Sequence, residues 1–165
     1  MDNMEEYKIP DEAIEKLKDP EVLRRQMDEG KTFQEVIGYS QETMEKFYKA
    51  AYSLFQQQEY QKAADAFIFL TTLNPNTNSY WLGLGMSEQL CGGYQGALLA
   101  YAMAILTDVE NPTAHYHSAS CYRVLRDFDS AIQSLDMAVR CADDKPQYAH
   151  LKQQALSAKL ALEKK

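Results

Sequence analysis

The sequence has no long apolar run and only three cysteines. No stretch of about 18 consecutive apolar residues occurs, which excludes a membrane-spanning helix. The N-terminal segment MDNMEEYKIPDEAIEKLKDP is acidic and lacks the apolar core of a signal peptide. The cysteines are odd in number and form no CxxC pair, which indicates free thiols in a reducing compartment. We therefore expect a cytoplasmic protein.

Catalytic and metal-binding patterns are also missing. The sequence contains no nucleophile–base pair, no glycine-rich phosphate loop and no spaced pair of carboxylates. His115 and His117 are two positions apart, so on a helix their imidazoles point about 200° apart and cannot share an ion. We expect no enzyme activity, no cofactor and no bound metal.

Positive charge is in short supply. The 17 Lys and Arg residues are outnumbered by 24 Asp and Glu residues, which gives a formal net charge of −7. Such a surface repels phosphate backbones and anionic lipids, which predicts that the chain binds neither nucleic acid nor membranes directly. Hydrophobic residues make up 45% of the chain, which is enough for a packed core. The charge and composition favour a basic or apolar protein partner.

What the sequence does contain is an internal period of 34 residues, visible in aromatic and small-residue columns. The columns are Tyr60, Tyr94 and Phe128; Ala63, Ala97 and Ala131; Phe67, Tyr101 and Leu135; and Ala51, Gly85 and Ala119. The repeat resembles the tetratricopeptide repeat, whose pattern the middle copy carries as Trp81-x-x-Leu84-Gly85 followed by Ala97-x-x-x-Tyr101. Phe47 and His115 stand in the Trp81 column of the outer copies.

Each copy is predicted to form two helices joined by a tight turn. The first helices are expected over 41–56, 78–90 and 112–125, and their partners over 60–73, 94–107 and 128–141. The small residues of the two helices should face each other and allow a close approach. A last helix over 146–163 should cap the stack, because a terminal repeat needs a polar cover. We therefore expect an all-α protein with three tandem tetratricopeptide repeats within 40–145 (about 44–77, 78–111 and 112–145), an N-terminal helical arm over 1–39 and a C-terminal cap over 146–165.

The N-terminal arm does not follow the period. Short helices are expected over 11–18 and 20–28, and Thr32-x-x-Glu35 is a capping-box pattern ahead of Ser40, which can cap the first repeat helix. The arm has a broad apolar side made of Ile14, Leu17, Val22, Leu23 and Met27. Either this side folds back on the repeats, or it packs against a second copy in a homodimer.

The first helices carry an apolar stripe beyond the one that the core needs. Tyr48, Tyr52 and Phe55 lie at i, i+4 and i+7, about 100° around the helix from the core stripe. The equivalent positions of the other copies hold Leu82, Met86 and Gln89, then Tyr116, Ser120 and Arg123. First helices line the concave surface of a repeat solenoid, so these residues predict a peptide-binding groove. In the alternative interpretation, the arm or the last helix simply covers Tyr48 and Tyr52.

The segment YKAAYSLFQQQEYQKAADAF, in register with LGLG, resembles the class II chaperones of bacterial type III secretion (the LcrH/SycD type) over roughly residues 28–160. The resemblance implies a cytoplasmic chaperone whose concave groove holds an extended N-terminal segment of hydrophobic translocator proteins and keeps them soluble for secretion. It also implies an arm that is often used for dimerisation. The family's groove aromatics fall on Tyr48, Tyr52 and Phe55, whereas Gln89 and Arg123 match less well.

A generic repeat scaffold or regulatory adaptor is the alternative. Scaffolds that grip C-terminal carboxylates place Lys, Arg and Asn on their first helices. The corresponding positions here hold Tyr48, Tyr52 and Leu82, which favours the chaperone interpretation.

Overall fold

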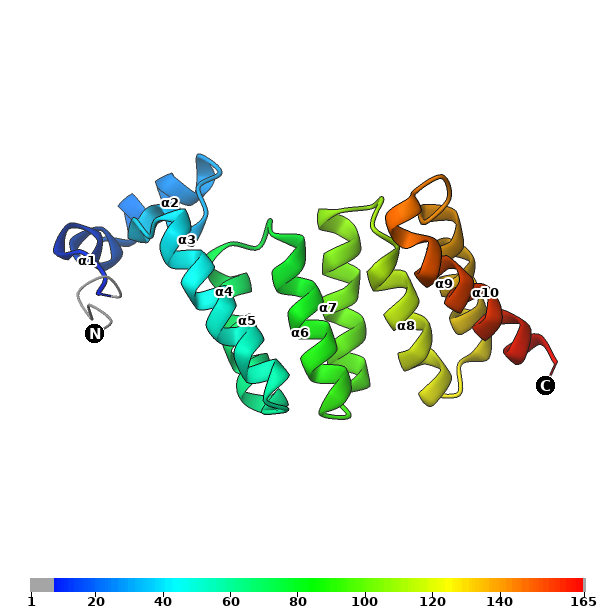
Figure 1. Ribbon diagram of the computed structural model, residues 1–165. Coiled ribbons are helices and arrows are strands. Elements are labelled where there is room, and N and C mark those ends of the chain that lie inside the picture. Colours follow the sequence, from blue (N-terminus) through cyan, green and yellow to red (C-terminus); the bar gives the residue numbers. More distant parts are fainter. Residues whose placement is uncertain (1–7, 165) are drawn as a thin grey trace.

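The computed structural model describes residues 8–164, and the regular structure in this range is entirely helical (Figure 1). The helices are α1 (Asp11–Lys18), α2 (Pro20–Asp28), α3 (Phe33–Ile37), α4 (Gln41–Gln56), α5 (Tyr60–Leu73), α6 (Asn78–Leu90), α7 (Tyr94–Thr107), α8 (Pro112–Val124), α9 (Phe128–Cys141) and α10 (Ala149–Glu163), with a short 3-10 helix over Pro146–Tyr148. Three helix pairs stand side by side, with the arm at one end and α10 at the other. This arrangement confirms the predicted fold class. Within the described range no helix is long and apolar enough to cross a membrane.

The same turn closes each helix pair. Gln58, Gly92 and Arg126, spaced by 34 residues, all adopt a left-handed backbone with φ of 64°, 82° and 64°. The next residue in each turn donates its backbone N–H to a carbonyl five positions earlier, as Gly93 does to Glu88 at 2.8 Å. This hydrogen bond is the Schellman ending of a helix. The repeat is thus defined by its turn as well as by its core.

Small residues bring the paired helices close together. Ala51, Ala63, Ala97 and Ala131 are completely buried, as the column pattern predicted. A Cβ atom added to Gly85 would lie 2.5 Å from Cε1 of Tyr101, closer than real Cβ contacts come. Glycine at this position therefore makes room for a fully buried tyrosine ring.

Three details differ from the sequence-based prediction. Phe128 was expected in the core but is 37% exposed. Tyr60 packs its ring against Phe55 at 5.4 Å between centroids, whereas the residue five positions before Phe128 is Arg123, which provides no such aromatic surface. The last helix begins with a 3-10 turn, so α10 starts at Ala149 rather than at 146. The first helix of the third repeat, α8, ends at Val124, one residue earlier than expected.

The arm contacts the first repeat and leaves part of its apolar side exposed. The capping box is present, since the Thr32 hydroxyl accepts from the Glu35 backbone N–H at 3.3 Å and the Glu35 carboxylate accepts from the Thr32 backbone N–H at 2.6 Å. Leu17 packs against the core cluster of the first repeat. Ile14 and Met27, however, are 36% and 50% exposed, and Val22 and Leu23 are only half-buried. The arm is therefore folded back at Leu17, while much of its apolar side stays free.

Candidate functional site

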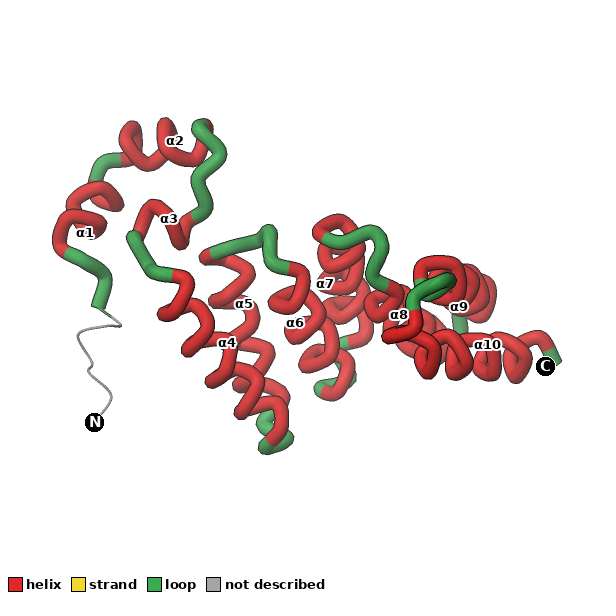
Figure 2. Tube along the Cα trace, turned by 45° about the horizontal axis from the view of Figure 1, so that its top comes forward, coloured by secondary structure: helices red, strands yellow, loops and turns green. Residues whose placement is uncertain are grey.

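The first helices of the repeats form one face of the molecule. In Figure 1, α4, α6 and α8 lie next to one another with α5, α7 and α9 behind them, and α10 continues the row beside α8. Figure 2 shows the same row of helices from a second direction. Side chains that leave the first helices away from their partners therefore share one surface.

A pocket of about 170 Å³ opens on this surface between α4, α5 and α6, and we call it the N-terminal pocket. Its lining residues are Tyr48, Tyr52, Phe55, Phe67, Ser79, Leu82, Gly83 and Met86. Of the six groove residues predicted on α4 and α6, five line it and Gln89 does not. No charged side chain does, so the pocket fits an apolar side chain of a bound segment.

Aromatic contacts fix the shape of the N-terminal pocket. The Tyr48 ring is stacked on Tyr52 at 6.4 Å, makes an edge contact with Phe67 at 6.1 Å and lies tilted against Tyr80 at 5.8 Å between centroids. Tyr52 stays 48% exposed, so neither the arm nor α10 covers it. This argues against the alternative in which the second stripe is merely buried surface.

Phe67 was predicted as a core residue, and it is both core and pocket floor. Its side chain is only 2% exposed, yet it lines the pocket beneath α6. A Cβ atom added to Gly83 would collide with the Phe67 ring. The LGLG segment could have predicted this contact, because its two glycines each leave room for an aromatic ring: Gly83 for Phe67 and Gly85 for Tyr101.

Gln89 does not line either groove pocket. Its side-chain oxygen accepts a hydrogen bond from the Tyr101 hydroxyl at 2.8 Å. The Tyr101 ring is completely buried, and burial raises the pKa of its phenol. Gln89 thus satisfies a buried hydroxyl rather than contacting a ligand, which departs from its predicted groove role.

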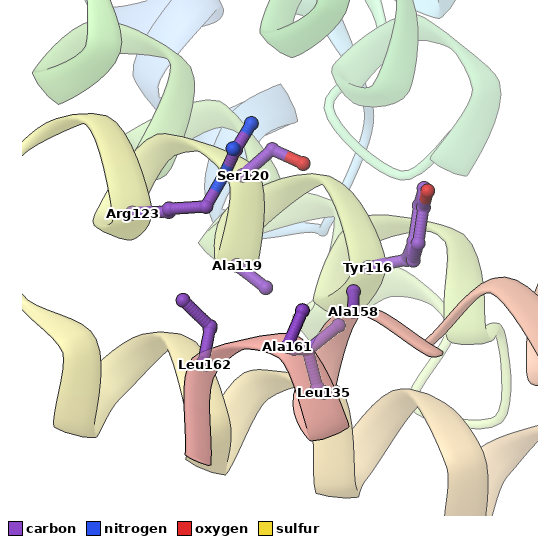
Figure 3. A pocket seen from close by; sticks show the side chains of 8 residues that line it. All are labelled: Tyr116, Ala119, Ser120, Arg123, Leu135, Ala158, Ala161 and Leu162. Atoms are coloured by element: carbon purple, nitrogen blue, oxygen red, sulfur yellow. The ribbon is translucent and has the colours of Figure 1, made fainter. Parts of the chain in front are cut away.

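A second pocket of about 300 Å³ lies between α8, α9 and α10, and we call it the C-terminal pocket (Figure 3). Its lining residues are Tyr116, Ala119, Ser120, Arg123, Leu135, Ala158, Ala161 and Leu162. The predicted residues Tyr116, Ser120 and Arg123 are therefore brought together. Sequence reasoning missed the wall from α10, although Leu151, Ala155, Ala158 and Leu162 recur at helical spacing along it and pack on the last core cluster.

The titratable side chains His117 and Cys121 on α8 belong to no metal site in the described part of the chain, and burial holds both neutral. Among residues 8–164 no group of three or more His, Cys, Asp or Glu side chains is arranged to hold a metal. His117 stacks on Tyr101 at 5.7 Å between centroids, and burial lowers its pKa, which keeps it neutral. Burial likewise raises the pKa of the Cys121 thiol to about 11, so this cysteine is a poor nucleophile at neutral pH.

Comparison with known proteins places the chain in a family. The tetratricopeptide repeat family model matches residues 48–90 and 91–146. Low calcium response locus protein H of Yersinia pseudotuberculosis is 29% identical over 112 residues, which are 68% of this chain and 67% of that protein.

Solved structures extend this similarity. Two structures of the Yersinia enterocolitica type III secretion translocator chaperone SycD, an alternative dimer and a complex with a peptide of the translocator YopD, are each 27% identical with a TM-score of 0.73. Each match covers 75% of this chain and 94% or 95% of the SycD chain. Pseudomonas aeruginosa PcrH bound to the chaperone binding region of PopB is 30% identical, with 73% and 97% of the two chains covered and a TM-score of 0.71. The chain therefore belongs to the tetratricopeptide-repeat family, in the group that includes low calcium response locus protein H and the translocator chaperone SycD.

Proposed function

We propose that this protein is a cytoplasmic chaperone of a bacterial type III secretion system. It binds an extended N-terminal segment of hydrophobic translocator proteins along the face formed by α4, α6 and α8, and thereby keeps them soluble and competent for secretion. The observation that carries this proposal is the N-terminal pocket, which is aromatic, uncharged and open. The complex of SycD with a YopD peptide supports it, because a homologue binds a segment of a translocator.

The physical basis is side-chain burial without an energy source. Two or three apolar side chains entering the groove contribute roughly 1.5–3 kcal/mol each before the cost of ordering the segment. Such binding is reversible, which suits a client that must be released for export. The groove residues are tyrosines, a phenylalanine, a leucine and a methionine, so the site binds and does not catalyse.

We also propose that the arm mediates a homodimer. The exposed side chains of Ile14 and Met27 lie on short helices at one end of the repeat row, away from the groove pockets. An exposed apolar side of this kind is typical of a protein interface. A structure of SycD described as an alternative dimer supports this proposal.

Co-expression tests the proposed function. The probe is the translocator YopD, a peptide of which binds SycD, produced with and without the chaperone. We expect the probe to be soluble only with the chaperone, and to become insoluble when its N-terminal segment is deleted. A probe that binds but is equally soluble alone would instead identify a scaffold or regulatory adaptor, and would contradict the chaperone function.

A further inference from the structure

We propose that the C-terminal pocket recognises an acidic side chain of the client segment, whose carboxylate accepts hydrogen bonds from the guanidinium of Arg123. This inference rests on the proposed function and specifies the partner of the same groove. It assigns different chemistry to the two pockets: the N-terminal pocket takes an apolar side chain, and the C-terminal pocket takes a carboxylate beside an apolar group.

Among the described residues, Arg123 is an unpaired cation at the C-terminal pocket. Three of the four lysines within residues 145–164 each pair with a carboxylate of this chain: Lys145 with Glu110 at 2.8 Å, Lys152 with Asp143 at 2.5 Å and Lys159 with Asp136 at 2.6 Å. Within the described part of the chain, the Arg123 guanidinium takes part in no ion pair or side-chain hydrogen bond. It is also the one charged residue among those lining the C-terminal pocket.

The pocket itself is built for a short acidic side chain on an apolar floor. Figure 3 shows the Arg123 side chain and the Ser120 hydroxyl on the same side of the pocket, with Tyr116 farther away toward the start of α8. Below them, Ala119 and Leu135 form the floor, and α10 supplies an apolar wall. A carboxylate at the rim would accept from the guanidinium, and hydroxyls are available for its remaining lone pairs.

The net charge makes this contact selective. A chain of charge −7 repels an acidic segment at long range, so an acidic client is bound only where a local cation offsets the repulsion. The N-terminal pocket has no charged side chain to bind a carboxylate. The acidic residue of the client therefore also determines which end of the extended segment lies at α8. Arg123 would then set the direction and register of the client.

Arg123 also lies in the last turn of α8, where a cation interacts favourably with the helix dipole, so the test must separate binding from stability. A matched control is Arg140, which is exposed in the last turn of α9 and lines neither groove pocket. The variants are Arg123→Gln, Arg123→Glu and Arg140→Glu in the full chain. Thermal melts establish that each is folded.

The experiment selects random extended peptides displayed on phage against each folded protein. The wild type and Arg140→Glu should enrich peptides with apolar residues plus Asp or Glu at a fixed spacing. Arg123→Gln should retain the apolar preference and lose the acidic one, and Arg123→Glu should enrich Lys or Arg there instead. Synthetic Glu and Gln versions of one selected peptide should differ about 3- to 10-fold in affinity for the wild type at low salt. The two versions should bind Arg123→Gln with about equal affinity.

Two results would overturn the inference, and they are distinguishable. Apolar peptides enriched by the wild type without an acidic position, or with an acidic preference that survives Arg123→Gln, would refute the role of Arg123 alone. Failure of the folded wild type to enrich any peptide would refute the peptide-binding groove, and with it both this inference and the proposed function.

Discussion

At the scale of single residues, the repeated turn contains strain that can be relieved. Gln58 adopts a left-handed backbone that glycine occupies without penalty and that costs other residues roughly 1–2 kcal/mol. Gln58→Gly should therefore raise the free energy of unfolding by about 0.5–1 kcal/mol, since part of the gain is lost to the flexibility of glycine in the unfolded chain. Urea denaturation of both proteins measures the difference.

The converse change provides the control. Gly92 occupies the equivalent turn position with φ of 82°, and a Cβ atom added there would meet nothing within 4 Å. Gly92→Ala should thus be destabilising by about 1 kcal/mol through backbone strain alone. If Gln58→Gly lowers stability, or Gly92→Ala leaves it unchanged, the repeated turn is not strained as we describe.

The sequence predicted residues well where spacing alone decides their environment. The buried alanine columns follow from the period, because a small residue at a helix contact is needed in every copy. Phe128 and Gln89 differ from the prediction because their environment depends on which side chain faces them. Phe55 packs on Tyr60, whereas the equivalent position before Phe128 holds Arg123, and Gln89 accepts the hydrogen bond of the Tyr101 hydroxyl.

At the scale of elements, the arm packs several apolar side chains inward, Leu17 among them, and leaves Ile14 and Met27 exposed. The double variant Ile14→Lys with Met27→Lys should convert the proposed dimer to a monomer, because it places charge in the interface and leaves the Leu17 contact intact. Light scattering at several protein concentrations measures the mass. A wild type that is already monomeric, or a double variant that remains dimeric, would contradict the proposed interface.

Leu17→Lys is the matched control for the arm. This side chain packs on the first core cluster, so the substitution should lower the melting temperature. Complete deletion of the arm would mix the two effects, which is why point substitutions give the clearer test.

Helix α10 covers the last repeat. Its Ala155 is completely buried, and the half-buried Leu151 and Leu162 pack against the cluster that also contains Leu135 and Ala138 of α9. A chain that ends at Lys145 should lose a few kcal/mol of stability, because each half-buried leucine supplies part of the roughly 1.5–3 kcal/mol of a fully buried one, and should aggregate through the uncovered face. Thermal melting with light scattering detects both, and a shortened chain that melts like the full one would refute the capping role.

The helix ends that depend on neighbouring residues were predicted correctly, whereas contacts between distant helices were not. The caps at Thr32 and Ser40 depend on neighbouring residues, and the structure contains both, with the Ser40 hydroxyl accepting from the Thr43 backbone N–H at 3.1 Å. Pro146 lies 34 residues after Pro112, but Gln153 stands where the small-residue column of Ala119 would continue, so the place of α10 as a wall of the C-terminal pocket was not evident from the columns. Its contacts with α8 and α9 arise only when the solenoid is assembled.

At the scale of the whole molecule, the groove is a property of the stack. The N-terminal pocket combines α4, α5 and α6, and the C-terminal pocket combines α8, α9 and α10, so neither belongs to a single repeat. A bound segment that spans both pockets would contact all three helix pairs. Such a surface suits an extended chain and offers no closed cavity for a small substrate.

The central claim is that this face binds an extended client segment through the N-terminal pocket. Calorimetric titration of the translocator YopD peptide that binds SycD tests it most directly, with Tyr52→Ala, Phe55→Ala and the core control Leu70→Ala as variants. Leu70 is completely buried on α5 and lines neither groove pocket, whereas Phe67 serves both roles and would not separate them. We predict that Tyr52→Ala and Phe55→Ala weaken binding by about 1–3 kcal/mol. Phe55→Ala also loses its contact with Tyr60, but both variants should lose less stability than Leu70→Ala, which costs about 2–5 kcal/mol and still binds when folded. Tyr52 and Phe55 variants that melt early yet bind normally would show that these residues belong to the core and that the groove is not the binding site.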